Sequence, residues 1–245
     1  MGSSGLEETV NQCITLKKED CEVVRTAEEL ITWIESVDEQ FRADDRIEEE
    51  LIKRFFEEIM PLGHLARHKY LGKPGLSLRP KIGNQSYDAE IFDTSSSTEH
   101  ITRIEFTSAY RDSDLALRLE YLDQHGTVYG TGHVFRNGTK ASGGHVHVVQ
   151  EFEDHQMRLD TMLDTIKARI IYKLGKPYEA NTILTIVFDD TILYRDTDLP
   201  QLQPRFRDIM LSTQALSKFC DVYILGASGK TLWEFGESVT AHLTR

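Results

Sequence analysis

The sequence is poor in cysteine and has no long apolar run. Its 245 residues include 3 cysteines, and none of them belongs to a CxxC pair. An odd set without such a pair argues against a disulfide framework and a zinc knuckle, and it agrees with a reducing cytoplasm. No apolar run approaches the roughly 18 residues that a membrane-spanning helix needs. We therefore expect a cytoplasmic protein without a membrane partner.

Acidic residues are absent from one stretch although they dominate the chain as a whole. The net charge is −12, and residues 1–60 carry 17 acidic against 7 basic residues. Residues 61–87 contain no acid, and their cations are Arg67, Lys69, Lys73, Arg79 and Lys81. A basic stretch that leads directly to Asp88 can follow a phosphate backbone, which makes nucleic acid a candidate partner. The alternative is a solvated loop.

The remaining composition is that of a globular protein, with 40% hydrophobic and 28% charged residues. Apolar periodicity and capping residues predict helices near 26–41, 45–60, 112–124, 151–174 and 204–219. Strand patterns occur near 76–81, 86–108, 128–149, 182–188, 222–225 and 231–235. This order predicts an α/β fold with a mixed β-sheet flanked by helices. We expect an acidic N-terminal segment with one helix over 1–44 and the α/β domain over 45–245.

Several details of this prediction are specific enough to be checked. Residues 1–25 are polar with little periodicity, which predicts irregular structure. The helix that begins near 45 is expected to end at Met60, because Pro61 follows. Ile171 is expected on the buried stripe of the helix over 151–174. The apolar run 182–188 is typical of a strand that is buried on both faces.

The stretch 86–108 is the most informative part of the chain. Two strand-like runs flank the polar linker TSSSTEH, which indicates a β-hairpin with its loop centred near Ser97. Folding about that centre places Phe92 near Ile101 and Glu90 near Arg103. It also places Asp88 near Glu105.

Strand alternation then separates an apolar face from a charged face that carries both acids. Like charges directly opposed in a sheet are destabilising, and their Cβ atoms lie about 4.5–5.5 Å apart. Asp88 and Glu105 at that separation suit a shared hard cation with oxygen ligands, Mg²⁺ or Mn²⁺. The alternative is a solvated hairpin face in which Arg103 neutralises the acids.

A helix followed by a hairpin with Asp on one strand and Glu-x-Lys on the next resembles the PD-(D/E)XK nuclease-like superfamily. The residues that carry the resemblance are Tyr87-Asp88 and Ile104-Glu105-Phe106-Thr107. It implies a restriction-endonuclease-like core and a nuclease that acts on nucleic acid phosphodiesters. Asp88 and Glu105 would then hold the metal ion, and Thr107 would border the catalytic site. The alternative is a catalytically inactive module of the same fold that binds nucleic acid or a protein partner.

The resemblance also shows what is missing, because Thr107 stands where the family has a lysine. A hydroxyl cannot supply the positive charge of that lysine. Lys173 and Lys167, on the helix over 151–174, are candidates to replace it, and Lys173 lies closer to the centre of the apolar stripe. The alternative is that their stems pack while the amines reach water. Relatives often add a glutamate from the second helix, for which Glu48 and Glu58 are candidates.

Other motifs are weaker. His64 and His68 are four residues apart, but Leu65 stands where the HExxH zinc motif needs glutamate. His133, His145 and His147 lie on a predicted ribbon and would form a metal site only if they converged; exposed histidines are the alternative.

Residues 226–231, GASGKT, imitate a phosphate-binding loop. The complete motif needs a glycine where Ile224 stands and a helix afterwards, whereas the residues that follow are strand-like. We therefore predict a hairpin turn.

Overall fold

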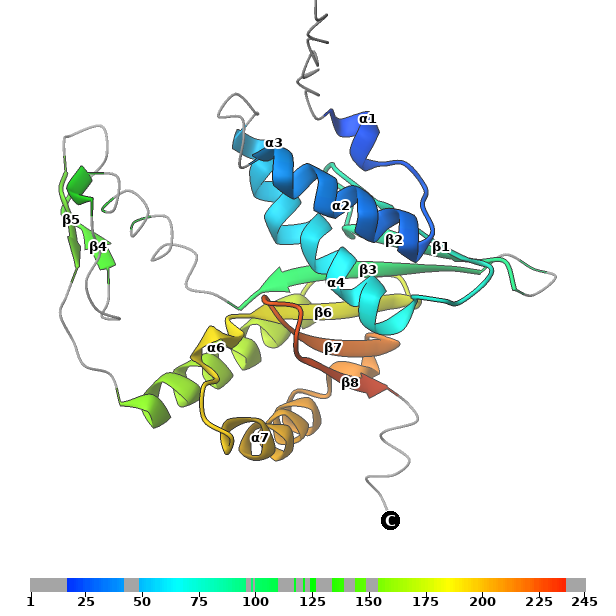
Figure 1. Ribbon diagram of the computed structural model, residues 1–245. Coiled ribbons are helices and arrows are strands. Elements are labelled where there is room, and N and C mark those ends of the chain that lie inside the picture. The colour runs from blue at the N-terminus through cyan, green and yellow to red at the C-terminus, as the bar shows by residue number, and fades with distance from the viewer. Residues whose placement is uncertain are drawn as a thin grey trace, which may run out of the picture.

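Six strands form one mixed β-sheet in the computed structural model of the protein (Figure 1). In spatial order they are β1 (Leu76–Pro80), β2 (Ala89–Asp93), β3 (His100–Ser108), β6 (Thr182–Phe188), β7 (Asp221–Gly226) and β8 (Leu232–Gly236). The central strands β3, β6 and β7 are parallel, and the outer pairs are antiparallel. Helices flank this sheet, so the predicted α/β class is confirmed.

The structure describes residues 17–41, 49–95, 98, 100–109, 117, 121, 124–126, 134–138, 144–148 and 154–236. Most of the predicted helix over 112–124 lies outside these residues. Within the predicted ribbon, β4 (Val134–Arg136) and β5 (Val146–Val148) form an antiparallel pair. None of the helices in the described part of the chain is both long and apolar enough to cross a membrane.

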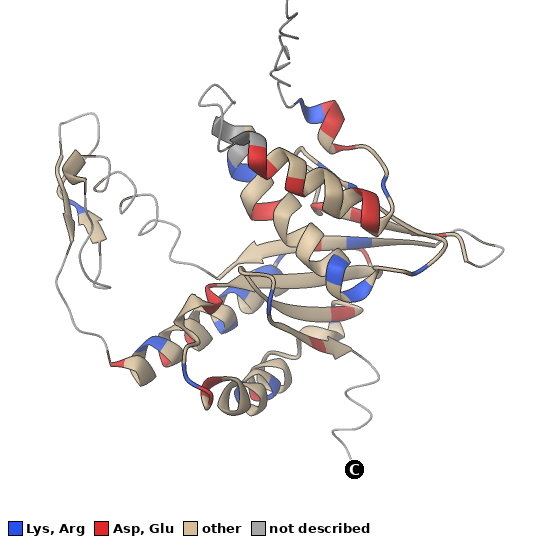
Figure 2. Cartoon of the chain, in the orientation of Figure 1, with Lys and Arg blue, Asp and Glu red and all other residues tan. Residues whose placement is uncertain are grey.

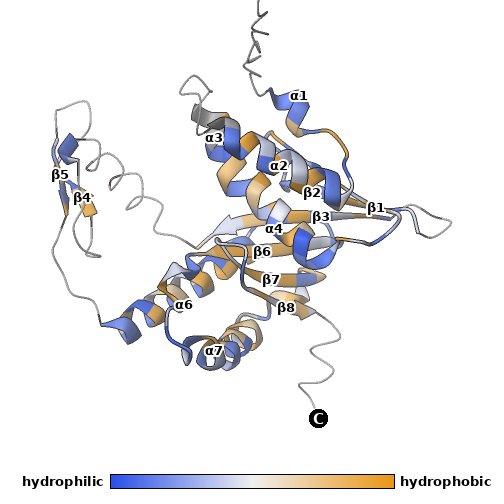
Figure 3. Ribbon diagram, viewed as in Figure 1, coloured by the Kyte–Doolittle hydropathy of each residue, from blue (hydrophilic) through white to orange (hydrophobic). Residues whose placement is uncertain are grey.

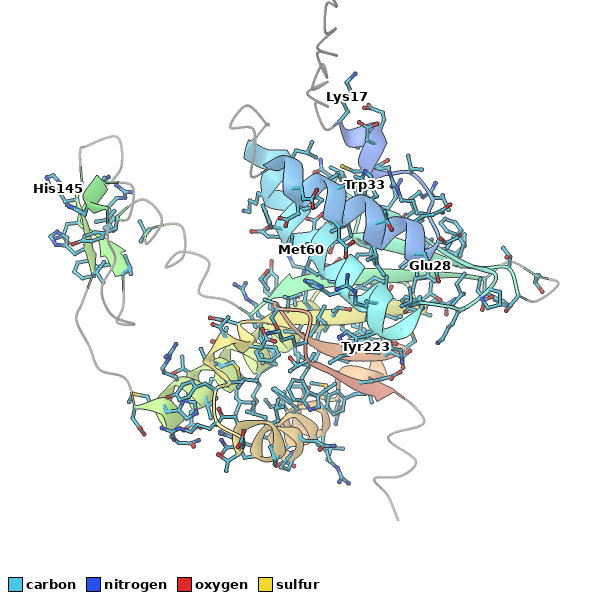
Figure 4. The ribbon with its side chains drawn as sticks, viewed as in Figure 1. Lys17, Glu28, Trp33, Met60, His145 and Tyr223 are labelled. Carbon is cyan, nitrogen blue, oxygen red and sulfur yellow. The ribbon has the colours of Figure 1, made fainter. Side chains whose placement is uncertain are left out.

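The N-terminal helices cover one face of the sheet. They are α1 (Lys18–Cys21), α2 (Ala27–Phe41), α3 (Glu49–Arg54), the π-helical turn η1 (Phe55–Ile59) and α4 (Met60–Lys69). Thr26 and Glu29 begin α2 with a capping box, each side chain accepting from the other's backbone N–H. Trp33, Met60 and Tyr223, labelled in Figure 4, belong to the core between these helices and the sheet.

Two predictions for this layer are wrong. The turn α1 interrupts the segment predicted to be irregular, and its Cys21 is fully buried. The second helix does not end at Pro61 but continues to Lys69. The π turn explains this continuation: it closes with Met60 N–H donating to the Phe55 oxygen. The hydrogen-bond spacing therefore changes just before the proline, which has no N–H to donate.

Two longer helices, α6 (His155–Leu174) and α7 (Asp198–Thr213), cover the opposite face (Figure 1). The short 3₁₀ turns η3 (Asp190–Ile192) and η4 (Ala215–Ser217) belong to the same half of the chain. Strand β6 is buried along its whole length between the two layers, as predicted, and it forms part of the strongly hydrophobic centre of Figure 3. The apolar side chains of the sheet are thus divided between two cores.

Details of these helices differ from the prediction. Ile171 is 53% exposed, because it lies off the stripe that packs on the sheet. Helix α7 begins at Asp198 rather than near Pro204, which lies inside it. The carboxylate of Asp198 is buried and accepts from His155 Nε2 at 2.8 Å, a contact between distant residues that periodicity does not reveal. The helix ends where Gln214 adopts a left-handed φ of 53°.

Candidate active site

The hairpin of β2 and β3 has the register that its sequence predicts. Phe92 lies opposite Ile101. Pairing continues past the end of β2, because the Asp88 N–H donates to the Ile104 oxygen at 2.8 Å. Because Ile104 is already the ladder partner of Ala89, the pairing is irregular at this point; Asp88 lies one residue outside the strand and shares a cavity with Glu105.

The two faces of the hairpin also separate as alternation predicts. The apolar face lies in the core beneath α2 and α4 and includes Ala89, Ile91, Ile104 and Phe106. Glu105 and Thr107 belong to the opposite face, and only 8% and 9% of their surfaces are exposed. Both line a cavity of about 230 Å³ together with Asp88, Glu58 and Lys173. The structure thus brings the three site residues predicted from the sequence to one cavity.

Lys173 reaches this cavity from the last turn of α6. Its ammonium group donates a hydrogen bond to Glu105 Oε1, and the Tyr178 hydroxyl donates to the same oxygen at 3.2 Å. Lys167 is exposed on the same helix. The expectation that Lys173 supplies a positive charge beside Glu105 is confirmed as a matter of position, and its chemical role stays a prediction.

Glu58 enters the site from η1, which packs against β3. Its Oε1 accepts from the Arg54 guanidinium at 2.9 Å, whereas its Oε2 is buried and has no hydrogen-bond partner among the described residues. From the sequence alone, Glu58 is only one of two candidates. The other candidate, Glu48, lies outside the described residues. The π turn sets the direction of this side chain, and helical periodicity alone does not predict such a turn.

Two carboxylates of the site, Asp88 and Glu58, are held in unfavourable surroundings. Burial raises the pKa of Asp88 to about 8, and the charges of Glu105 and Glu58 add to this effect. Burial also raises the pKa of Glu58 to about 6, although Arg54 opposes the shift. The Phe106 N–H, at 2.7 Å from Asp88 Oδ2, is a favourable contact that does not cancel these effects. A cation in the cavity would relieve them.

The donor atoms fit a hard divalent cation. Asp88 Oδ1, Glu105 Oε2 and the orphaned Glu58 Oε2 are carboxylate oxygens, the ligand type that Mg²⁺ and Mn²⁺ prefer. Within the described ranges no cluster of three or more Asp, Glu, His or Cys side chains is arranged to hold a metal by itself. An ion here would therefore depend on one or two carboxylates together with water and substrate oxygens, which is usual for Mg²⁺.

Arg103 does not neutralise the acids of the hairpin. It lies opposite Glu90 in the register, yet its guanidinium pairs with Glu179 at 2.6 Å. Glu90 accepts instead from Arg79 on β1 and from the Tyr87 hydroxyl, both at 2.9 Å. The interpretation in which Arg103 compensates the carboxylates at the end of the hairpin is therefore wrong.

The basic stretch before Asp88 is largely neutralised inside the fold. Its ion pairs are Arg67 with Glu35, Lys69 with Glu234, Arg79 with Glu90 and Lys81 with Glu22. Part of the compensating charge comes from the acidic α2 (Figure 2). Nucleic acid binding gains no support from this stretch.

The predicted histidine pair packs against the turn between β7 and β8. His68 Nε2 lies 2.8 Å from the Gly229 oxygen. Gly229 has a φ of 70°, and a Cβ at this position would lie 2.3 Å from His64 Nδ1. Close packing therefore accounts for this pair. On the ribbon, His147 stacks on Phe135, and His133 lies outside the described residues.

The GASGKT segment forms the predicted hairpin turn between β7 and β8. Asp190, which follows β6, holds this turn. Its Oδ1 accepts from the Ser228 N–H at 2.9 Å, and its Oδ2 accepts from the hydroxyls of Ser228 and Thr231 at 2.5 and 3.1 Å. The turn is thus a structural element.

Comparison of the chain with protein-family models, with curated proteins and with solved structures yields no match.

Proposed function

We propose that the protein is a metal-dependent nuclease that hydrolyses phosphodiester bonds of nucleic acid. The observation that carries the proposal is the ammonium group of Lys173 on Glu105, in the same cavity as Asp88. The sequence lacks a lysine at position 107, and α6 supplies one to the same cavity.

Asp88 and Glu105 would hold Mg²⁺ or Mn²⁺ through the oxygens that face the cavity. When bound, such an ion polarises the scissile phosphate and lowers the pKa of a water molecule. Glu58 supports this arrangement, because its buried Oε2 has no partner in the described structure and can accept from a water in the cavity.

Lys173 has three N–H donors, of which one binds Glu105, so that two remain for water and a phosphate oxygen. The ammonium would orient the attacking water and offset the negative charge that develops on the phosphate. The water oxygen bonds to phosphorus, the ester P–O bond breaks, and the proton released by the water ends on the leaving alcohol. Thr107 borders the cavity and can only hydrogen-bond.

A second candidate function is a catalytically inactive module of the same fold that binds nucleic acid or a protein partner. The net charge of −12 and the ion-paired basic stretch favour it. A missing lysine would also have favoured it, but Lys173 removes that argument.

A cleavage assay separates the two functions. Single-stranded and duplex DNA and RNA are incubated with the protein in Mg²⁺ or Mn²⁺ and, in parallel, in chelator. The proposal expects metal-dependent cleavage that Asp88→Ala and Lys173→Ala abolish. Lys167→Ala, a lysine substitution on the exposed side of the same helix, should leave cleavage intact. Absence of cleavage on every substrate, or equal cleavage by Asp88→Ala, would contradict the proposal.

A further inference from the structure

A shallow hollow of about 540 Å³ lies on the exposed side of α6. The described residues that line it are Thr161, Asp164, Thr165, Ala168, Arg169 and Tyr172. Thr161, Thr165, Ala168 and Tyr172 follow one another at helical spacing, so the hollow runs along one face of the helix. From Thr161 to Tyr172, eleven residue steps along the helix, that face is roughly 16 Å long.

The hollow adjoins the carboxylate cavity. Arg169 lines both of them, and Lys173 follows Tyr172 directly in the last turn of α6. Tyr172 also contributes to the electrostatic surroundings of Tyr178, whose hydroxyl binds Glu105. A chain with a phosphate in the cavity would therefore continue into the hollow.

Tyr172 is the aromatic group among the described residues of this hollow. Its surface is 56% exposed, although its neighbours on the buried side of the helix are in the core. The Lys176 ammonium lies 4.9 Å from the centroid of its ring. Such a ring, beside cations and on a rigid helix, is a stacking platform for a nucleobase.

The described lining of the hollow carries one acid and one cation, Asp164 and Arg169, so its charge does not favour a phosphate over a base. The Asp164 carboxylate repels phosphate but accepts hydrogen bonds from the amino and imino groups on the edge of a base. The small side chain of Ala168 leaves room for a flat ring against the helix.

We propose that the hollow binds an unpaired nucleotide next to the scissile phosphate, with its base stacked on Tyr172, so that the substrate is single-stranded nucleic acid. This inference rests on the proposed nuclease function. The recessed position of the site agrees with it, since the side chains of Lys173 and Glu105 are only 15% and 11% exposed. In a duplex the bases are stacked and paired within the helix, and none is free to occupy the hollow.

Binding measurements decide this inference. Fluorescence anisotropy is recorded in Mg²⁺ with a labelled 12-nucleotide single strand, as DNA and as RNA, and with the corresponding duplexes. The protein carries Asp88→Asn, which keeps an acceptor for the Phe106 N–H and leaves the strand uncleaved. We expect the single strand to bind more tightly than the duplex, and Tyr172→Ala to raise its Kd about tenfold.

Two controls accompany this variant. Tyr172→Phe keeps the ring and should bind like the parent, which separates stacking from loss of the hydroxyl group. Ile171→Ala removes an adjacent side chain that is also exposed, and it should have no effect. Equal single-strand binding by Tyr172→Ala and the parent, or tighter binding of the duplex, would overturn the inference.

Cleavage by the protein with Asp88 restored distinguishes this inference from the nuclease proposal. Cleavage of single strands and duplexes at equal rates that do not depend on Tyr172 would overturn the inference and leave the nuclease function standing. Binding of single strands through Tyr172 without any cleavage would contradict the nuclease function and support the role of Tyr172.

Discussion

Two regions of the molecule bury carboxylates near the sheet and treat them in opposite ways. Asp190, after β6, accepts from one backbone N–H and two hydroxyl groups of the β7–β8 turn. All three donors are neutral and lie within a few residues of one another. The carboxylate is thus fully used in holding the turn.

The cavity at the end of the β2–β3 hairpin gathers Glu58, Asp88 and Glu105 without such a supply of donors. One oxygen of Glu58 is buried without a partner in the described structure, and the pKa values of Glu58 and Asp88 are raised. The donors that do arrive include the charged groups of Arg54 and Lys173, from different helices. The Asp190 carboxylate is satisfied by donors of the turn, whereas Glu58 and Asp88 are not satisfied in this way, and we propose that a cation completes their cluster.

The largest expected effect is on catalysis. Lys173→Ala removes the ammonium from the cavity and should lower kcat/KM for nucleic acid about 100-fold or more, the scale of losing one group that stabilises developing charge. Asp190→Asn should change it by no more than a few fold. Steady-state cleavage rates of both variants test this comparison. An equal loss of kcat/KM in the two variants would contradict it.

Substitution of Asp190 should affect stability more than it affects catalysis. Asp190→Ala leaves the Ser228 N–H and two hydroxyl groups without their acceptor, which costs about 1–3 kcal/mol of unfolding free energy. Because the turn has no part in the proposed ion site, the loss should be the same in Mg²⁺ and in chelator. Urea denaturation in both buffers measures it, and a loss that depends on Mg²⁺ would contradict this division of roles.

A further effect concerns the pH dependence of stability. The pKa of Asp88 rises from its ordinary 3.8 to about 8 in the fold, so the folded state retains a proton that the unfolded state loses. In chelator, its contribution to stability is therefore complete below pH 4 and is lost as pH rises to 8. Asp88→Asn should raise the melting temperature relative to the parent by clearly more at pH 8 than at pH 4, with a difference of at least the roughly 2–4 °C that 1 kcal/mol gives in a chain of this length. A difference between the two proteins that does not change with pH would contradict the shifted pKa.

Local periodicity predicted the parts of the site that one hairpin and one helix determine. Alternation along 86–108 placed Asp88 and Glu105 together at the end of the hairpin, because a centred loop and an apolar face leave one register. The stripe of α6 placed Lys173 toward the sheet for a similar reason. The strand over 182–188 was evident from its unbroken apolar run.

The rest depends on contacts between distant residues. Glu58 faces the cavity because a π turn shifts the helix, and the same turn carries the helix through Pro61. The basic stretch pairs with acids as far away as Glu234, so a count of its charges does not reveal its neutralisation. The hollow at Tyr172 follows from how α6 lies beside the cavity.

The most direct test of the central claim is a titration of the metal-free protein with Mn²⁺ by isothermal calorimetry, at a pH above the raised pKa of Asp88. We predict binding that Asp88→Ala and Glu105→Ala abolish and that Asp190→Asn retains. At ten times its Kd, the ion should add about 1.4 kcal/mol to the free energy of unfolding. Absence of binding, or binding that persists in Asp88→Ala, would contradict the claim that the carboxylate cluster is a cation site.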